Sequence, residues 1–170
     1  MRIFNAMTCS ALATATLSAA LIIAPGASAT PEDTDNLHLR DQHNMPVVVP
    51  ESARYVLFVG DTAGKDLISS TFGQADSNIL EENSAYVIAN FSEEPTALLQ
   101  RYTVPELQDL PYQVLMDTTG AQTGDWDHAP GAVKLLRLDA HQVTAVEVVD
   151  SPAALMQAVT EATAAGTDGE

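Results

Sequence analysis

Short apolar runs alternate with amphipathic stretches along most of the chain, and this order predicts an α/β protein. Two runs rich in β-branched and aromatic residues predict buried strands, at 55–59 and 85–89, and a third strand is predicted at 112–116. Apolar residues at helical spacing follow the first two runs. Because buried strands that alternate with helices pair in parallel through right-handed crossovers, the pattern predicts a parallel central sheet.

Capping residues and prolines mark the expected ends of the first two helices. Asp61 or Thr62 is expected to cap a helix that runs to Phe72. Ser92 is expected to begin a second helix, because acidic residues and an early proline follow it. Pro105 is expected to break that helix, since proline lacks the N–H group that a helix interior needs.

The C-terminal part of the chain predicts antiparallel strands and one more helix. After a long loop at 117–131, apolar residues alternate on both sides of 139–142, which predicts a β-hairpin. Ser151-Pro152 is expected to cap a closing helix. The whole pattern predicts one α/β domain whose mixed central sheet ends in a β-hairpin and a C-terminal helix.

The N-terminal residues are expected to lie outside this domain. Arg2, an apolar stretch and the motif Ala27-Ser28-Ala29 are typical of a signal peptide, and the apolar stretch is too short for a membrane span. A polar, extended arm is expected to follow, and Val47–Val49, between two prolines, is expected to form an edge strand. The predicted divisions are a signal peptide at 1–29, the polar arm at 30–46, the domain at 47–166 and a tail at 167–170.

Composition and charge narrow the functions that this domain can have. Cleavage at about Ala29 would place the protein in the periplasm or outside the cell, and it would remove Cys9, the only cysteine of the sequence. Disulfides and thiol catalysis are then excluded. With 23 acidic and 7 basic residues, the formal charge is −16, which excludes nucleic acid and anionic lipid as partners because both require clustered Lys and Arg.

Two segments, together with the order of elements, resemble the thioredoxin-like family. Residues 90–104 resemble the segment in which the family's second strand passes into an acidic helix start. Leu110-Pro111-Tyr112 resembles the strand that carries the family's cis-proline, with Pro130 as the other candidate; the distance from the preceding helix favours Pro111. The resemblance covers roughly 54–115 and the last helix, and it implies a single-domain, three-layer thioredoxin-like sandwich.

The sequence departs from this family where the family has its redox site, a Cys-x-x-Cys motif after the first central strand. Ala63 and Asp66 stand at the equivalent positions, and neither can exchange disulfides. The resemblance therefore implies an exported, non-redox module that needs no cofactor and binds a protein or peptide partner in the family's groove. The residues expected to line that groove are Asp61, Thr62, Ala63, Gly64, Leu110, Pro111 and Tyr112.

A flavin- or metal-assisted oxidoreductase is the alternative function. The signal peptide, Asp41-Gln42, the Pro-Tyr strand and the strand at 134–139 also resemble small exported bacterial proteins of unknown role, some of which carry the label FAD/FMN-containing dehydrogenase. However, no dinucleotide-binding glycine motif accompanies this resemblance.

Two polar clusters offer metal ligands, and for both the solvated surface is the favoured interpretation. His38, Asp41 and His43 form a loose cluster in the polar arm. The long loop could hold a divalent cation, although it lacks the ligand spacing of a calcium loop. Its candidate ligands are Asp117, Asp125, Asp127 and His128.

Overall fold

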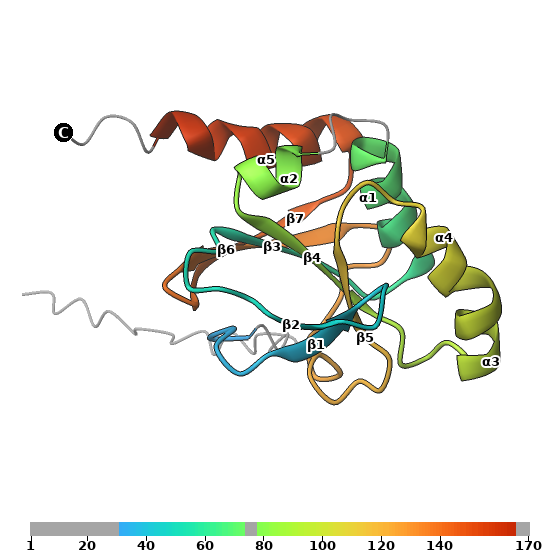
Figure 1. Ribbon diagram of the computed structural model, residues 1–170. Helices are drawn as coiled ribbons and strands as arrows, with labels where there is room; N and C mark the ends of the chain where they lie inside the picture. Colours follow the sequence, from blue (N-terminus) through green and yellow to red (C-terminus); the bar gives the residue numbers. More distant parts are fainter. Residues whose placement is uncertain (1–30, 74–77, 166–170) are drawn as a thin grey trace, which may run out of the picture.

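The computed structural model describes residues 31–73 and 78–165 of the chain. The predicted signal peptide, Cys9 and the predicted tail lie outside the described residues. One mixed sheet of seven strands, in the order β2-β1-β5-β4-β3-β6-β7, forms the centre of the domain (Figure 1). The strands are β1 His38–Asp41, β2 Pro46–Val48, β3 Tyr55–Val59, β4 Ala85–Asn90, β5 Val114–Asp117, β6 Val133–Asp139 and β7 Gln142–Val149.

The three central strands are parallel, as their apolar runs predict. β3 pairs with β4 and β4 with β5 in parallel, whereas β6 and β7 form the predicted antiparallel hairpin on the β3 side of the sheet. All five residues of β3 are buried, because both faces of this strand are covered. The third predicted strand begins two residues later than expected, at Val114.

The helices cover one face of the sheet (Figure 1). Leu67 and Phe72 of α1, Leu99 of η1 and Leu155 of α5 share one apolar core with that face. The opposite face packs against irregular chain from the N-terminal segment and from the long loop. The three layers are therefore helices, sheet and loops. The helices are α1 Thr62–Phe72, α2 Ile79–Glu82, α3 Thr96–Leu98, η1 Leu99–Thr103, α4 Val104–Gln108 and α5 Pro152–Ala165.

The expected helix break at Pro105 is wrong. The chain forms a π-helical turn, η1, and continues directly into α4, where Pro105 stands in the first turn. The N–H of Val104 bonds to the carbonyl of Leu99, five residues earlier, and this wider turn carries the chain past the proline. The apolar residues at helical spacing in this segment are Leu98, Leu99 and Tyr102; Leu99 is buried, whereas Leu98 and Tyr102 are about half exposed.

The polar arm is also corrected, because part of it belongs to the sheet. β1 lies between β2 and β5 and pairs antiparallel with both. Leu37 and Leu39 are buried on the loop-covered face, whereas His38 and Arg40 point to the other face and are exposed. β2 is the predicted edge strand. The described domain therefore begins before residue 47.

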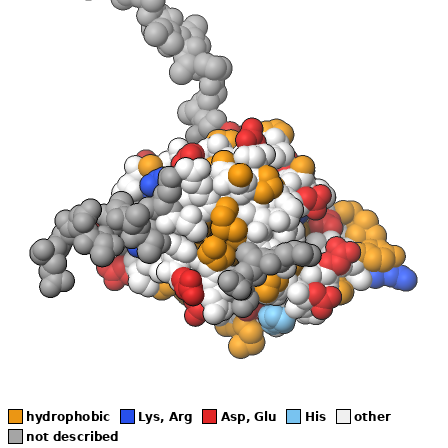
Figure 2. Space-filling view, turned by 90° about the horizontal axis from the view of Figure 1, so that it is seen from above, with side chains coloured by type: hydrophobic (Ala, Val, Ile, Leu, Met, Phe, Trp, Pro, Cys, Tyr) orange, Lys and Arg blue, Asp and Glu red, His pale blue; other side chains and the backbone are white. Residues whose placement is uncertain are grey.

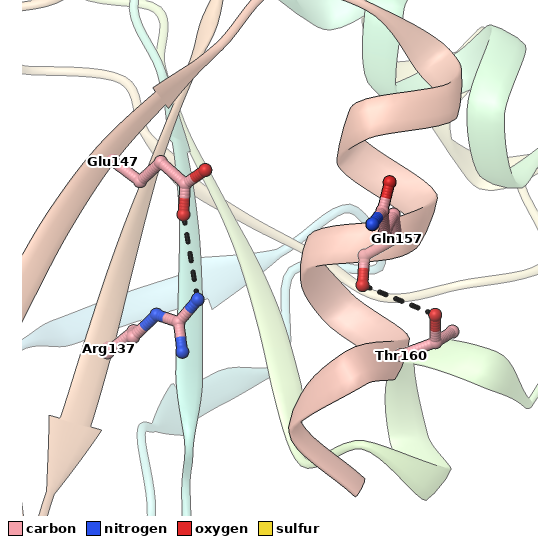
Figure 3. A network of polar contacts seen from close by, with 4 residues as sticks. All are labelled: Arg137, Glu147, Gln157 and Thr160. Atoms are coloured by element: carbon pink, nitrogen blue, oxygen red, sulfur yellow. Dashed lines mark hydrogen bonds and ion pairs between the residues drawn. The ribbon is translucent and has the colours of Figure 1, made fainter. Parts of the chain in front are cut away.

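The hairpin and the last helix close the domain. Figure 3 shows Arg137 of β6 beside Glu147 of β7, with 3.6 Å between Nη2 and Oε2, and Thr160 of α5 bonded to the carbonyl of Gln157 one turn earlier. Both charged side chains are about half exposed to solvent, which screens the attraction, so this ion pair contributes little to stability. Figure 2, seen from above relative to Figure 1, shows Asp and Glu side chains spread over that face with few Lys or Arg among them.

Candidate functional site

The turn between β3 and α1 is locked by the carboxylate of Asp61. Oδ1 of Asp61 accepts a hydrogen bond from the N–H of Gly64 at 2.7 Å, which caps α1 as predicted. Oδ2 accepts a second bond, also of 2.7 Å, from the N–H of Gly131. Gly131 has a φ of 72°, a conformation that favours glycine, and it turns the chain just before β6. Asp61 therefore joins the start of α1 to the end of the long loop.

The environment of Asp61 keeps its carboxylate charged. Burial raises the pKa of Asp61, but the bonds from Gly64 and Gly131 and the nearby His128 and Lys65 outweigh burial and hold the pKa below its usual value. Gly64 is buried against β6, where an added Cβ would lie 2.8 Å from the carbonyl oxygen of Ala132. These contacts make the turn a packed structural element rather than an open groove.

The expected cis-proline is not found, since no cis peptide bond occurs in the described parts of the chain. Pro111 and Pro130 are both trans. The preference for Pro111 is also wrong in its position, because Pro130 immediately precedes Gly131 and so stands next to the α1 turn. Gly131 supplies the change of direction there, and its N–H bond to Asp61 fixes the loop.

A cavity of about 180 Å³ lies beside this turn, between α1, η1–α4 and the helix-covered face of β3, β4 and β5. Val59, Val87 and Val114 of the three strands form its apolar floor. Thr103 of η1 donates a hydrogen bond of 2.6 Å to Oε1 of Glu94, at the cavity wall. The cavity therefore has an apolar interior and a polar rim.

Lys65 of α1 is the one basic side chain among the residues that line this cavity. Its Nζ lies 3.8 Å from the centre of the Phe91 ring, a cation–π geometry. Burial lowers the pKa of Lys65, and the nearby Glu94, Asp61 and Asp66 offset this effect only in part. Asp66, Glu94 and Glu106 also line the cavity, so acidic groups outnumber basic ones at its rim.

The predicted groove residues are only partly brought together. Thr62, Leu110 and Tyr112 line the cavity. Asp61 and Thr62 line a shallower depression next to it, with His128 and Glu93. Among the others, Ala63 is exposed, Gly64 is buried, and Pro111 lines a different depression near Leu80 and Tyr86.

Asp41 and Gln42 position Tyr112, a role that the sequence did not reveal. The side-chain amide of Gln42 is buried; its Nε2 donates to the carbonyl of Tyr112 at 2.9 Å, and its Oε1 accepts from the N–H of Val114 at 2.9 Å. Asp41 accepts a bond of 3.0 Å from Nε2 of Gln113. The Asp-Gln pair and the Pro-Tyr strand, noted separately in the sequence, are thus bonded to each other.

Lys65, Phe91 and Glu94 are among the cavity residues that sequence reasoning missed. Only Lys65 carried a signal, because it is the single basic residue of the helix that follows the first buried strand. Phe91 and Glu94 lie in the segment after β4, and nothing in their spacing indicates that they meet Lys65. Tyr112 was expected at the site, and burial raises its pKa, while a hydrogen bond with Ser69 acts in the opposite direction.

The candidate metal ligands of the long loop do not form a metal site. No group of three or more His, Cys, Asp or Glu side chains that could hold a metal ion occurs among the described residues. Asp117 is buried and turned into its own loop, where both oxygens accept several hydrogen bonds. Asp127 lies 3.7 Å from the ammonium of Lys134 instead. Asp125 and His128 are exposed. His38, Asp41 and His43 do not form such a metal-binding group either.

Trp126 connects this loop to the core. Its ring meets the ring of Phe58 edge-on, with 4.9 Å between the centroids. Phe58 belongs to β3, so the indole fixes the loop against the sheet face that the helices leave uncovered.

No helix of the described residues is long and apolar enough to span a membrane.

Comparisons with known proteins identify the fold. No protein-family model and no curated protein matches the sequence. A candidate thioredoxin from Neisseria meningitidis matches with a TM-score of 0.53 and 14% identity over 82% of this chain and 95% of that one. Peroxiredoxin Q of Xanthomonas campestris matches with a TM-score of 0.52 and 13% identity, over 82% and 97% of the two chains.

A thioredoxin-like protein from Porphyromonas gingivalis gives a TM-score of 0.52 at 13% identity, over 76% of this chain and 91% of that one. At such identities the likeness concerns the backbone alone, because fold and activity are separable. The described residues of this chain form the seven-stranded mixed sheet, and the TM-scores above 0.5 extend over most of it and of the matched chains. The chain is therefore a single-domain protein with the thioredoxin-like fold.

Proposed function

We propose that this chain is a non-redox binding protein, and that it accepts an apolar side chain of a peptide or protein partner in the cavity beside α1. The cavity itself is the observation that carries the proposal. Its volume of about 180 Å³ is comparable to a large side chain, and it lies beside the position where the thioredoxin-like family has its redox site. Three of the predicted groove residues contribute to it.

The chemistry at the turn supports binding rather than thiol exchange. Residues 61–66 contain no cysteine, and the only cysteine of the sequence, Cys9, precedes the described residues. The carboxylate of Asp61 is occupied by two backbone N–H groups, so it is not free to act as a nucleophile or base. What the site offers is an apolar interior, a partly desolvated ammonium and several carboxylates.

The charges at the rim favour a basic partner. Asp66, Glu94 and Glu106 line the cavity with one lysine, and the whole chain carries a formal charge of −16. An apolar residue flanked by Lys or Arg would fill the cavity and place its charges next to the acidic rim. Electrostatic complementarity of this kind increases the association rate and the specificity of binding.

Two substitutions on neighbouring positions of α1 test this proposal. Ser69 lines the cavity, whereas Ser70 is exposed and does not. Binding of fluorescent peptides with a central leucine, flanked by lysines or by glutamates, is measured by anisotropy. Ser69→Leu should weaken binding of the lysine peptide at least about tenfold by filling the cavity, and Ser70→Leu should leave it unchanged. Equal binding by both variants, or no preference for the lysine peptide, would refute the proposal.

We further infer that the protein acts outside the cytoplasm. The inference rests on residues 1–29, which have the charge, apolar stretch and Ala-Ser-Ala motif of a signal peptide. Expression of the whole chain in a Gram-negative host, followed by fractionation and mass determination, should give a periplasmic protein that begins at Thr30. An uncleaved chain in the cytoplasm would contradict the inference.

A further inference from the structure

A second cleft, of about 590 Å³, lies on the other side of the η1–α4 helix from the cavity. Gln100, Val104 and Gln108 of that helix form one wall, and β1 with the turn after it forms the other. The loop at 117–122 closes one end. This volume is in the usual range of small-molecule sites. The cleft shares no lining residue with the cavity proposed to bind peptide.

Three side chains that carry or can gain positive charge line this cleft: His38 and Arg40 of β1, and His43 of the following turn. Arg40 is one of only 7 Lys and Arg residues in the chain, and His38 and His43 are two of its 4 histidines. Nη1 of Arg40 donates to the carbonyl of Asn44 at 2.8 Å, and no ion pair joins Arg40 to a carboxylate of the described residues. Within the described parts of the chain, Asn44 is thus the hydrogen-bond partner that the guanidinium of Arg40 has, and most of its five N–H donors face no protein acceptor there.

Other cations of the chain do have acidic neighbours. Lys134 lies 3.7 Å from Asp127, and Arg137 lies 3.6 Å from Glu147. Lys65 is affected by Glu94, Asp61 and Asp66. Arg40 thus differs from these cations in that a hydrogen-bonding carbonyl, and not a carboxylate, is its partner within the fold.

The two acidic residues that line the cleft are both used by the protein. Oδ1 of Asp41 accepts bonds of 2.9 Å from the N–H groups of His43 and Met45, and Oδ2 accepts from Gln113. The oxygens of Asp117 accept bonds from its own loop. Since the oxygens of both carboxylates already accept hydrogen bonds from other groups, neither carboxylate pairs with Arg40 in the fold.

Neutral side-chain amides complete the lining. The side-chain oxygen of Gln122 accepts a bond of 3.1 Å from the backbone N–H of His38, and the side-chain amide of Gln108 donates one of 2.9 Å to the backbone carbonyl of Gln42. Gln100 of η1 also lines the cleft. An amide offers N–H donors to an anionic oxygen and a carbonyl to a hydroxyl. The cleft therefore combines a cationic group with donors suited to a polar ligand.

We propose that this cleft binds a small organic anion, with its carboxylate or phosphate group against the guanidinium of Arg40 and between the imidazoles of His38 and His43. Guanidinium groups recognise both oxyanions through paired, charge-assisted hydrogen bonds. The titratable groups that line the cleft are His38, Arg40, Asp41, His43 and Asp117. Asp41 and Asp117 stay charged at neutral pH, because backbone bonds hold the pKa of each below its usual value despite burial.

Titration of the isotope-labelled whole chain with succinate or inorganic phosphate, followed by NMR, tests the proposal. Succinamide, which is neutral and of the same shape as succinate, is the ligand control. Saturable shifts at Arg40 and His38 are expected with at least one anion and not with succinamide. A response to succinate alone or to phosphate alone identifies the preferred group. No saturation by about 20 mM of either anion, well above a millimolar Kd, refutes the proposal.

Two arginine variants distinguish anion binding in the cleft from nonspecific attraction of the anion to positive charge on the protein. Arg40→Gln should weaken binding about tenfold or more by removing a charge-assisted contact. Arg101→Gln removes the same charge from η1 at an exposed position that does not line the cleft, and should leave binding unchanged. Equal losses in the two variants would refute the site. Ser69→Leu should leave anion binding intact, so failure of the peptide proposal does not affect this one.

Discussion

Replacement of Asp117 by asparagine tests whether the long loop is held by one carboxylate. The side chain is 3% exposed. Oδ1 accepts bonds from the N–H groups of Thr119 and Gly120 at 3.2 and 2.8 Å, and from the hydroxyl of Thr119. Oδ2 accepts from the N–H groups of Gln122 and Thr123 at 2.9 and 2.7 Å, and from the hydroxyl of Thr123.

The substitution changes almost no volume, so its cost comes from hydrogen bonding alone. Asparagine retains one oxygen and presents an NH₂ group where the other oxygen was. Two backbone N–H groups then lose their acceptor and face a second donor. A buried polar group left without its partner costs about 1 to 3 kcal/mol, so two of them cost about 2 to 6 kcal/mol. That is a large fraction of the 5–15 kcal/mol typical of a whole domain.

Urea denaturation followed by tryptophan fluorescence measures this cost directly. Trp126, the only tryptophan, belongs to the same loop and packs on Phe58. Asp125→Asn is the control, because Asp125 is an exposed acid of the same loop and should change the free energy of unfolding by less than about 0.5 kcal/mol. If Asp117→Asn costs no more than Asp125→Asn, the hydrogen-bond argument is refuted.

The effect of Asp117→Asn should also depend on pH in a definite direction. Burial raises the pKa of Asp117, but the bonds from Gln122, Thr123 and Thr119 outweigh it, and the folded-state pKa is lowered. Such a group stabilises the fold fully above the unfolded-state value of about 3.9, and this stabilisation is lost as the pH falls through the folded-state pKa. The gap between wild type and Asp117→Asn should therefore narrow below about pH 4. A gap that widens on acidification would contradict the assignment.

Three further predictions concern the α1 turn and the overall charge. Asp61→Ala removes the helix cap and the bond to Gly131, and should lower the free energy of unfolding, measured by urea denaturation, by about 2 to 4 kcal/mol. A decrease below about 0.5 kcal/mol would contradict the proposed role of Asp61 in joining α1 to the long loop. Gly64→Ala should destabilise the protein by about 1 to 2 kcal/mol although alanine favours helices, because its Cβ would lie 2.8 Å from a backbone oxygen; a gain in Tm would contradict this packing. Added NaCl up to about 0.5 M should raise the Tm by screening repulsion among the 23 acids, whereas a constant Tm would show that this repulsion is negligible.

The sequence is most informative where one local pattern determines the outcome. The apolar run of β3 is buried on both faces, and such a run has few alternatives in an α/β domain. Asp61 lies directly after that run and before helical spacing, so its role as a helix cap follows from neighbouring residues alone. The β6–β7 hairpin is similar, since its turn and alternating strands are contiguous.

Features that depend on contacts between distant residues are the ones that the sequence leaves undetermined. β1 resembles a polar arm because only Leu37 and Leu39 alternate with polar residues, and its pairing with β5 joins residues far apart in the chain. Asp117 looks like a metal ligand in sequence, and only the three-dimensional loop shows backbone N–H groups surrounding it. The cavity likewise combines Lys65 with Phe91 and Glu94, which belong to different elements.

The scarcity of basic residues makes the position of each one informative. In a chain of average charge, an arginine or lysine at a hollow in the surface carries little weight. Here there are only seven, and Lys134 and Arg137 are ion-paired with Asp127 and Glu147 within the fold. Lys65 and Arg40 instead line the two hollows on either side of the η1–α4 helix. Lys65 already has Glu94, Asp61 and Asp66 nearby, and the acidic rim of its cavity favours a basic partner. Arg40 has a carbonyl as its partner within the fold, so an anionic ligand would supply the opposite charge that it lacks, and the two binding proposals have opposite electrostatic preferences.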